Sequence, residues 1–188
     1  MKILVIDNYD SFTYNLVQLL GGKNRELLIV RNDDTTLEQV SDYNPDKILI
    51  SPGPGRPEDS GISISVLKEF GSTKPIFGVC LGHQAIGYIC GAEISNAPIL
   101  MHGKTSKIIH DGKTIFKDIP QNFDAMRYHS LIINKETVLS DLTISAYTED
   151  GIIMGVRHNV NPVEGIQFHP ESILTVEGKK LIENWLAL

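Results

Sequence analysis

Short, uninterrupted apolar runs alternate with stretches of helical periodicity through the first half of the chain. Each run is too short for a typical helix and predicts a strand, and the first run suits a central parallel strand buried on both faces. Strands separated by helices in this way form a parallel sheet with right-handed crossovers. The four runs are residues 2–6, 27–30, 48–50 and 76–79.

The segments between these runs predict helices with recognisable ends. Asp10 or Ser11 is the expected N-cap of the first helix, in which Phe12 belongs to the core. Thr35 or Thr36 is expected to cap the second helix, which ends before an Asn-Pro pair. Further helices are expected at residues 62–70, 81–89 and 176–188.

The pattern changes after residue 93, where turn signals recur every eight to twelve residues. Between them lie β-rich pieces, which predict an antiparallel or mixed extension of the sheet. We therefore expect an α/β fold: one domain, residues 1–188, with an open, flavodoxin-like, mostly parallel sheet and helices on both faces. The β-rich pieces are residues 106–109, 131–134, 142–147, 152–157 and 164–168.

Charge and cysteine content limit the partners and the compartment. The 188 residues carry a formal net charge of −6, which argues against nucleic acid and anionic membranes as main partners. No stretch approaches the ~20 apolar residues of a membrane span, and no signal peptide is recognisable. Two cysteines without a Cys-x-x-Cys pattern predict free thiols in a reducing cytoplasm.

A cysteine stands between two glycines where the fourth apolar run ends. Gly78, Cys80 and Gly82 form the pattern G-x-C-x-G, in which a strand turns sharply into a helix and exposes a nucleophile. The amides of Leu81 and Gly82 would lie unpaired at the helix N-terminus, where they can stabilise a thiolate or an oxyanion. The alternative is a buried, inert cysteine at a strand end.

A stiff loop, Ser-Pro-Gly-Pro-Gly at residues 51–55, follows the third apolar run. In parallel sheets, ligands bind at the carboxyl edge of the strands, where both this loop and the cysteine turn would lie. The Gly55 amide could then complete an oxyanion hole with the amide of Leu81. The alternative is an ordinary turn, because Pro-Gly pairs alone are weak evidence.

A thiol nucleophile needs a base, and the base needs an orienting group. His169 follows a short predicted strand, and Glu171 lies two residues further along a segment that Pro170 keeps extended or turned. Glu171 could therefore orient His169 toward Cys80 in a Cys-His-Glu triad, although an ordinary surface pair is the alternative. The histidines show no metal-ligand spacing, so we predict no metal site. The remaining histidines receive no role: His83, His102, His110, His129 and His158.

Three sequence blocks together resemble the class I, or triad, glutamine amidotransferase family. They are residues 51–55, residues 78–84 (Gly-Val-Cys-Leu-Gly-His-Gln) and residues 168–171 (Phe-His-Pro-Glu), in the family's order. The resemblance implies that Cys80 attacks the side-chain amide of L-glutamine, that His169 transfers protons, and that Glu171 supports His169. It covers nearly the whole chain.

The resemblance also implies how glutamine is bound. Backbone amides hold the oxyanion, Gln84 contacts the substrate, and two backbone segments bind its α-amino and carboxylate groups. No cofactor is implied for this chain. The implied substrate-binding residues are Gly53, Pro54, Gly55, Leu81, Gln84, Ser130 and Leu131.

Within the family, three segments resemble the glutaminase subunits that serve chorismate-aminating synthases. They are residues 7–15, 101–104 and 127–131. The resemblance implies a second chain, the synthase subunit, that binds chorismate and Mg²⁺ and receives ammonia, in tryptophan or folate biosynthesis or in both. Residues 7–15 and 101–104 are candidates for docking it, and the chain alone is expected to be a poor glutaminase.

Two other interpretations of the same residues remain open. One is a different cysteine hydrolase on the same architecture, against which Gln84 and the loop at residues 51–55 argue. The other is an inactive binding module, against which the intact Cys80, His169 and Glu171 argue.

Overall fold

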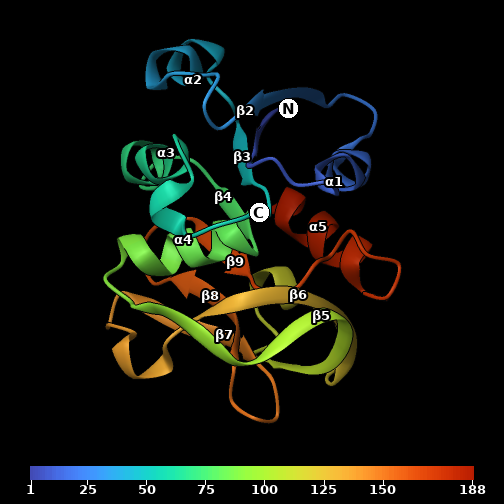
Figure 1. The fold of residues 1–188 in the computed structure, drawn as a ribbon. Coiled ribbons are helices and arrows are strands. Elements are labelled where there is room, and N and C mark those ends of the chain that lie inside the picture. The colour runs from blue at the N-terminus through green and yellow to red at the C-terminus, as the bar shows by residue number, and fades with distance from the viewer.

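A single curved sheet organises the chain. The computed structural model describes residues 1–188 and contains nine strands in the order β2-β1-β3-β4-β9-β8-β7-β5-β6 (Figure 1). The strands are β1 (Lys2–Asp7), β2 (Glu26–Arg31), β3 (Lys47–Ile50), β4 (Ile76–Val79), β5 (Ile94–His110), β6 (Phe123–Ile133), β7 (Leu142–Tyr147), β8 (Ile153–His158) and β9 (Val163–Ile166). The helices are α1 (Thr13–Leu20), α2 (Leu37–Tyr43), α3 (Ser63–Phe70), α4 (Leu81–Ile89) and α5 (Gly178–Ala187).

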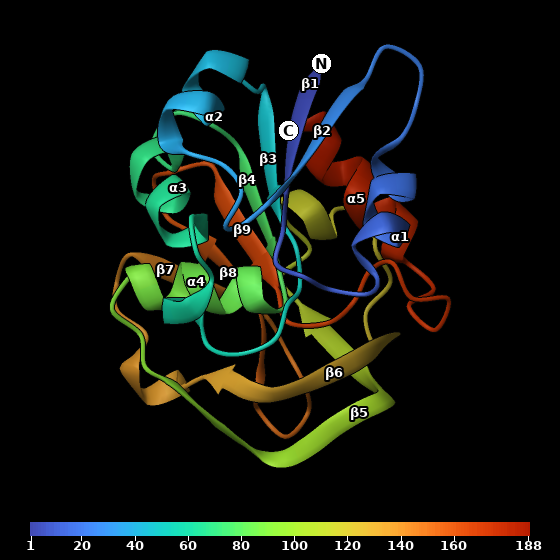
Figure 2. The same cartoon turned by 45° about the horizontal axis from the view of Figure 1, so that its top comes forward.

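The predicted parallel sheet with helices on both faces is confirmed. β2, β1, β3, β4 and β9 pair in parallel, and β3 and β4 are buried along their whole length. Helices α2, α3 and α4 lie on one side of the sheet, and α1 and α5 lie on the other (Figures 1 and 2). This arrangement explains why the runs that form β1, β3 and β4 show no polar alternation, whereas β2, at the edge of the sheet, is only partly buried.

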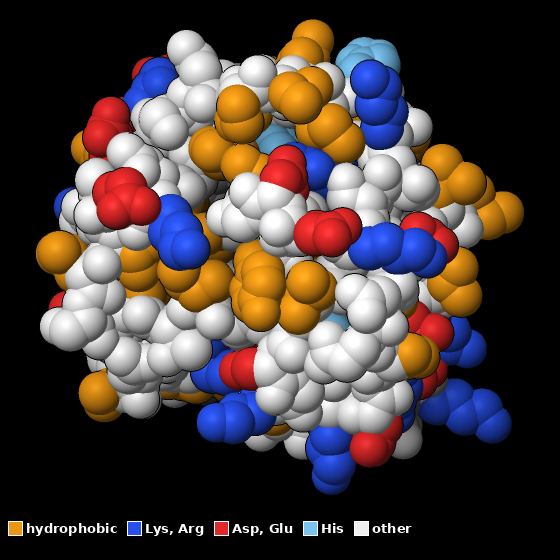
Figure 3. Space-filling model, turned by 90° about the horizontal axis from the view of Figure 1, so that it is seen from below, with side chains coloured by type: hydrophobic (Ala, Val, Ile, Leu, Met, Phe, Trp, Pro, Cys, Tyr) orange, Lys and Arg blue, Asp and Glu red, His pale blue; other side chains and the backbone are white.

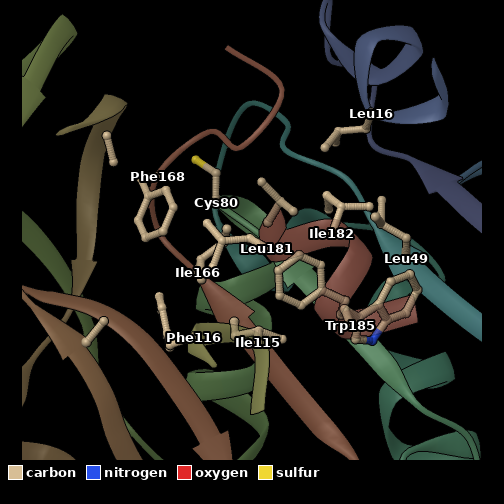
Figure 4. Packing of buried hydrophobic residues seen from close by; sticks show 14 of the residues in the cluster. Leu16, Leu49, Cys80, Ile115, Phe116, Ile166, Phe168, Leu181, Ile182 and Trp185 are labelled. Carbon is tan, nitrogen blue, oxygen red and sulfur yellow. The ribbon is translucent and has the colours of Figure 1, made fainter. Parts of the chain in front are cut away.

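Two hydrophobic clusters fill the spaces between the sheet and its helices. On the α1 and α5 side, Trp185 stacks on Phe77 with ring centroids 5.5 Å apart, and Cys80 lies at the edge of this cluster (Figure 4). On the other side, side chains of α2, α3 and α4 pack on β1, β3 and β4. The terminal helix α5 therefore anchors the face of the sheet beneath the cysteine.

The second half of the chain extends the sheet with mixed strand directions, as predicted. β8, β7, β5 and β6 add antiparallel strands. β9 pairs in parallel with β4 and so becomes the fifth parallel strand. β5 is also far longer than the predicted strand at residues 106–109, and with β6 it forms a curved ribbon at one end of the molecule (Figure 2). His110 is buried in β5.

The expected start of the first helix is wrong. α1 begins at Thr13 with Phe12 as its N-cap, and no side chain caps it. Asp10 instead accepts a hydrogen bond from the Phe12 amide at 2.8 Å and so stabilises the turn before the helix. Phe12 is 42% exposed and does not belong to the core. By contrast, one of the two predicted caps of α2 is correct: Thr36 is the N-cap, and it forms a reciprocal capping box with Gln39.

The surface is mixed in character. On the face shown in Figure 3, hydrophobic side chains gather in groups, with basic and acidic side chains interspersed between them. None of the helices combines the length and the apolar character needed to cross a lipid bilayer.

Candidate active site

The turn between β4 and α4 holds Cys80 in a strained conformation. Its φ is 53° and its ψ is −98°, a region that residues with a side chain rarely adopt. The Cys80 amide donates to the Ile166 carbonyl at 2.8 Å, which ties the turn to β9. A Cβ on Gly82 would lie 2.6 Å from the Ile50 carbonyl oxygen, so the turn requires glycine there. The first amides of α4 have no carbonyl one turn earlier and point out of the helix end.

His169 and Glu171 form a short, buried hydrogen bond. Nδ1 of His169 lies 2.6 Å from Oε1 of Glu171, and only 3% and 2% of the two side chains are exposed. Burial lowers the pKa of His169, but the Cys80 sulfur and the Glu171 carboxylate outweigh it and raise that pKa to about 10. No other group hydrogen-bonds to Nε2, so this nitrogen is available to Cys80.

The backbone of His169 is fixed from two directions. Its amide donates to the Met126 carbonyl of β6 at 2.9 Å. Its carbonyl accepts from the Thr175 hydroxyl at 2.6 Å, and this hydroxyl accepts from the Met126 amide at 3.0 Å. The parallel pairing of β9 with β4 brings this segment beside the cysteine turn, although the two are far apart in the sequence.

The loop at residues 51–55 is held by the turn that follows β1. The Asn8 amide donates to the Ser51 hydroxyl at 2.9 Å, and its side chain donates to the Ser51 carbonyl at 3.0 Å. A Cβ on Gly53 would lie 2.5 Å from Asn8 atoms and 3.0 Å from Leu81, and Gly55 has a φ of +79°. The buried start of residues 7–15 therefore shapes this loop.

A cavity of about 350 Å³ lies between these elements. It includes Cys80 and His169, whereas Glu171 lies behind His169 and the Leu81 side chain is buried away from it. A site of this size suits a small molecule. No group of three or more His, Cys, Asp or Glu side chains is arranged to hold a metal ion. The predicted substrate-binding residues that line the cavity are Gly53, Pro54, Gly55, Gln84, Ser130 and Leu131.

Gln84 is held in one orientation by two acceptors. Its Nε2 donates to the Leu131 carbonyl and to Oε1 of Gln167, each at 3.0 Å. Because a primary amide has two N–H donors, both are used, and only the Gln84 carbonyl oxygen remains for a ligand in the cavity.

His129, to which the sequence assigned no role, is buried beside the cavity. Its Nδ1 lies 3.0 Å from the Leu131 carbonyl, and its Nε2 accepts from Arg127 Nε at 3.1 Å. Burial and the Arg127 charge lower the pKa of His129 to about 4, so its ring is neutral near pH 7. His129 therefore fixes the backbone of residues 130–131.

Sequence reasoning missed three further groups at the site. Asp10, assigned as a helix cap, is the only carboxylate that lines the cavity, and burial raises its pKa. The Tyr128 carbonyl lies 3.9 Å from the Cys80 sulfur, and Gln167 Nε2 lies 3.5 Å from the same sulfur. Only Gln167 had a sequence signal, because it stands two residues before His169 on the predicted strand.

Comparisons with known proteins agree with this geometry. The family model "Glutamine amidotransferase class-I" matches residues 4–188. The chain is 53% identical over 184 residues to the aminodeoxychorismate/anthranilate synthase component 2 of Bacillus subtilis, covering 98% of this chain and 95% of that protein. It is 54% identical over 185 residues to the anthranilate synthase component 2 of Cyanophora paradoxa, covering 98% and 97%. A putative GMP synthase protein from Thermoplasma acidophilum has the same fold, with a TM-score of 0.87, 24% identity, and coverage of 100% of this chain and 92% of that one.

Proposed function

Because the chain belongs to the class-I glutamine amidotransferase family, we propose that it is the glutaminase subunit of an anthranilate synthase. It hydrolyses L-glutamine and delivers ammonia to a separate synthase subunit that aminates chorismate. The observation that carries the proposal is the buried His169–Glu171 pair beside Cys80, with Cys80 and His169 lining one cavity.

The reaction begins with a proton transfer inside the site. The Cys80 thiol gives its proton to His169 Nε2, and the resulting thiolate attacks the side-chain carbonyl carbon of glutamine. Glu171 holds the His169 ring with Nε2 toward the sulfur and stabilises the imidazolium. The raised pKa of His169 supports this role, since it favours the charged ring beside the thiolate.

The remaining steps return the enzyme to its starting state. The amides of Gly55 and Leu81 stabilise the oxyanion of the tetrahedral intermediate. His169 then protonates the amide nitrogen, the C–N bond breaks, ammonia leaves, and a γ-glutamyl thioester remains on Cys80. Water gives a proton to His169 and attacks the thioester, the C–S bond breaks, glutamate leaves, and the thiol takes the proton back.

Substrate recognition uses the residues that line the cavity. The backbone of residues 53–55 and of Ser130 and Leu131 binds the α-amino and carboxylate groups of glutamine, since the cavity has no Lys or Arg side chain to pair with the carboxylate. The free carbonyl oxygen of Gln84 suits a donor such as the α-ammonium group.

A partner chain is supported by the names of the relatives and by the surface near the cavity. Both relatives named above are component 2 of a synthase. Tyr14, Ile99 and Leu100 are more than 60% exposed, and Leu100 also lines the cavity. These residues lie in or beside the segments proposed to dock the synthase subunit, on which we expect the chorismate and Mg²⁺ sites.

A second candidate function is the same role in aminodeoxychorismate synthase. The Bacillus subtilis relative carries both names, which favours this alternative specifically. The choice of product belongs to the synthase subunit, so a chain that pairs with two synthases would serve both reactions.

The test uses the complex of this chain with its synthase subunit. We expect Cys80→Ala to abolish glutamine-dependent amination of chorismate and to leave ammonia-dependent amination intact. The control is Cys90→Ala, since Cys90 lies at the far end of α4 and burial raises its pKa to about 11. Glutamine-dependent activity that survives in Cys80→Ala would contradict the proposal, and the product, anthranilate or aminodeoxychorismate, identifies the pathway.

A further inference from the structure

A buried series of hydrogen bonds runs from β6 through Gln84 to Gln167, whose side chain contacts the nucleophile. This side chain has no exposed surface and does not line the cavity. Its Oε1 accepts from Gln84 Nε2 at 3.0 Å, and its Nε2 lies 3.5 Å from the Cys80 sulfur. Gln167 therefore contacts the nucleophile from inside the protein and not from the substrate side.

The groups along this series of hydrogen bonds determine which amide atoms of Gln84 and Gln167 donate and which accept. The Leu131 carbonyl can only accept, so the Gln84 atom 3.0 Å from it is the NH₂ group. The same NH₂ group lies 3.0 Å from Gln167, so the Gln167 atom there is the carbonyl oxygen. The remaining Gln167 atom, the one beside the Cys80 sulfur, must then be its NH₂ group.

The other end of the series gives a consistent answer. The Arg127 guanidinium can only donate, so His129 Nε2 accepts from it. In the neutral His129 ring the proton is then on Nδ1, which donates to the Leu131 carbonyl. The Leu131 carbonyl therefore accepts two hydrogen bonds, one from His129 Nδ1 and one from the Gln84 NH₂ group. This agrees with the orientation assigned to Gln84 and Gln167.

We propose that Gln167 donates a hydrogen bond to the Cys80 thiolate and stabilises it after the thiol proton has moved to His169. The inference rests on the proposed function, because it assigns Gln167 a part in the same reaction. Hydrogen bonds to an ionised acceptor are about twice as strong as those between neutral groups. The Gln167 amide is held in place before the thiolate forms, so it needs no reorganisation when the charge appears.

Few side chains around the sulfur favour negative charge on it. The Tyr128 carbonyl oxygen, 3.9 Å away, and the Asp10 carboxylate in the cavity wall both oppose negative charge on the sulfur. Of the other titratable groups nearby, His169 paired with Glu171 favours the thiolate, whereas His129 and His83 are neutral near pH 7. Gln167 is thus the second group, besides His169, whose side chain favours the thiolate.

The experiment measures alkylation of Cys80 in the full chain as a function of pH. The rate with iodoacetamide is followed by mass spectrometry of the Cys80 peptide, which keeps Cys90 separate. Gln167→Met removes the donor at similar volume, and Gln167→Leu serves if the first variant does not fold. The control is Gln18→Met, since Gln18 is exposed on α1 and far from the site.

We expect the midpoint of the Cys80 alkylation profile to rise by about one pH unit in Gln167→Met and to stay unchanged in Gln18→Met. In the synthase complex, glutaminase kcat should fall, because Gln167 acts on the nucleophile, and any rise in KM reports Gln84, which loses one of the two acceptors that hold it. An unchanged midpoint in a folded Gln167 variant would overturn the inference. If glutaminase activity did not depend on Cys80 at all, the proposed function would fail instead, so the two failures can be told apart.

Discussion

The buried His83 makes a sharp prediction about acid stability. Its side chain, on the first turn of α4, has no exposed surface, and neither ring nitrogen makes a well-formed hydrogen bond. Burial lowers its pKa from 6.5 to about 3, and the nearby Gly165 backbone opposes only part of that shift. The folded protein therefore keeps this ring neutral where the unfolded chain protonates it. Because the unfolded state binds more protons, stability is lost as the pH falls below 6.5.

The size of the effect follows from the pKa values. Between an unfolded pKa of 6.5 and a measurement at about pH 5 lie roughly 1.5 pH units, which correspond to about 2 kcal/mol of lost unfolding free energy. The folded pKa is well below that pH, so its exact value hardly matters. His83→Leu removes the group and, because the ring makes no well-formed hydrogen bond, should cost little near neutral pH.

The assay is urea unfolding at about pH 7 and about pH 5, followed by circular dichroism. We expect the difference in unfolding free energy between the two pH values to be about 2 kcal/mol smaller in His83→Leu than in the parent chain. His102→Leu, at an exposed position, should leave that difference unchanged. If His83→Leu lost as much stability on acidification as the parent chain, the neutral state of this buried histidine would be refuted.

Two further substitutions test the turn and a buried ion pair. Gly82→Ala places a Cβ 2.6 Å from the Ile50 carbonyl and should cost ~1–3 kcal/mol in urea unfolding. Gly21→Ala, where a Cβ would come no closer than 3.3 Å to a neighbouring atom, should cost less, and equal losses would count against the close approach. In the parent chain, Arg157 Nε lies 3.2 Å from the buried Glu164 carboxylate. Arg157→Met removes this charge partner and should lower the free energy of unfolding by ~3–5 kcal/mol near neutral pH. Burial raises the pKa of Glu164, so this loss should shrink on acidification, and a pH-independent loss would contradict it.

Features with a local cause can be predicted from the amino-acid sequence of this chain. The bounds of β4 and α4 agree with prediction, because an apolar run and a helical stripe meet at a glycine-flanked cysteine. Thr36 caps α2 because its hydroxyl and the Gln39 side chain satisfy each other's backbone amides within one turn. His169 and Glu171 could be paired because they stand two residues apart around Pro170, in a segment that the structure shows as a turn.

Which distant segments meet becomes clear only in the folded chain. Periodicity identified a strand before His169 but not its partner, and the parallel pairing of β9 with β4 is what brings His169 to Cys80. Phe12 shows the same limit, since helical spacing suggested the core whereas the position of α1 leaves it exposed. The hydrogen-bond chain through Gln84 and Gln167 joins α4, β6 and the end of β9, and no local pattern encodes it. Strand order and buried polar pairing depend on contacts between residues far apart in the chain, so they exist only once the sheet has formed.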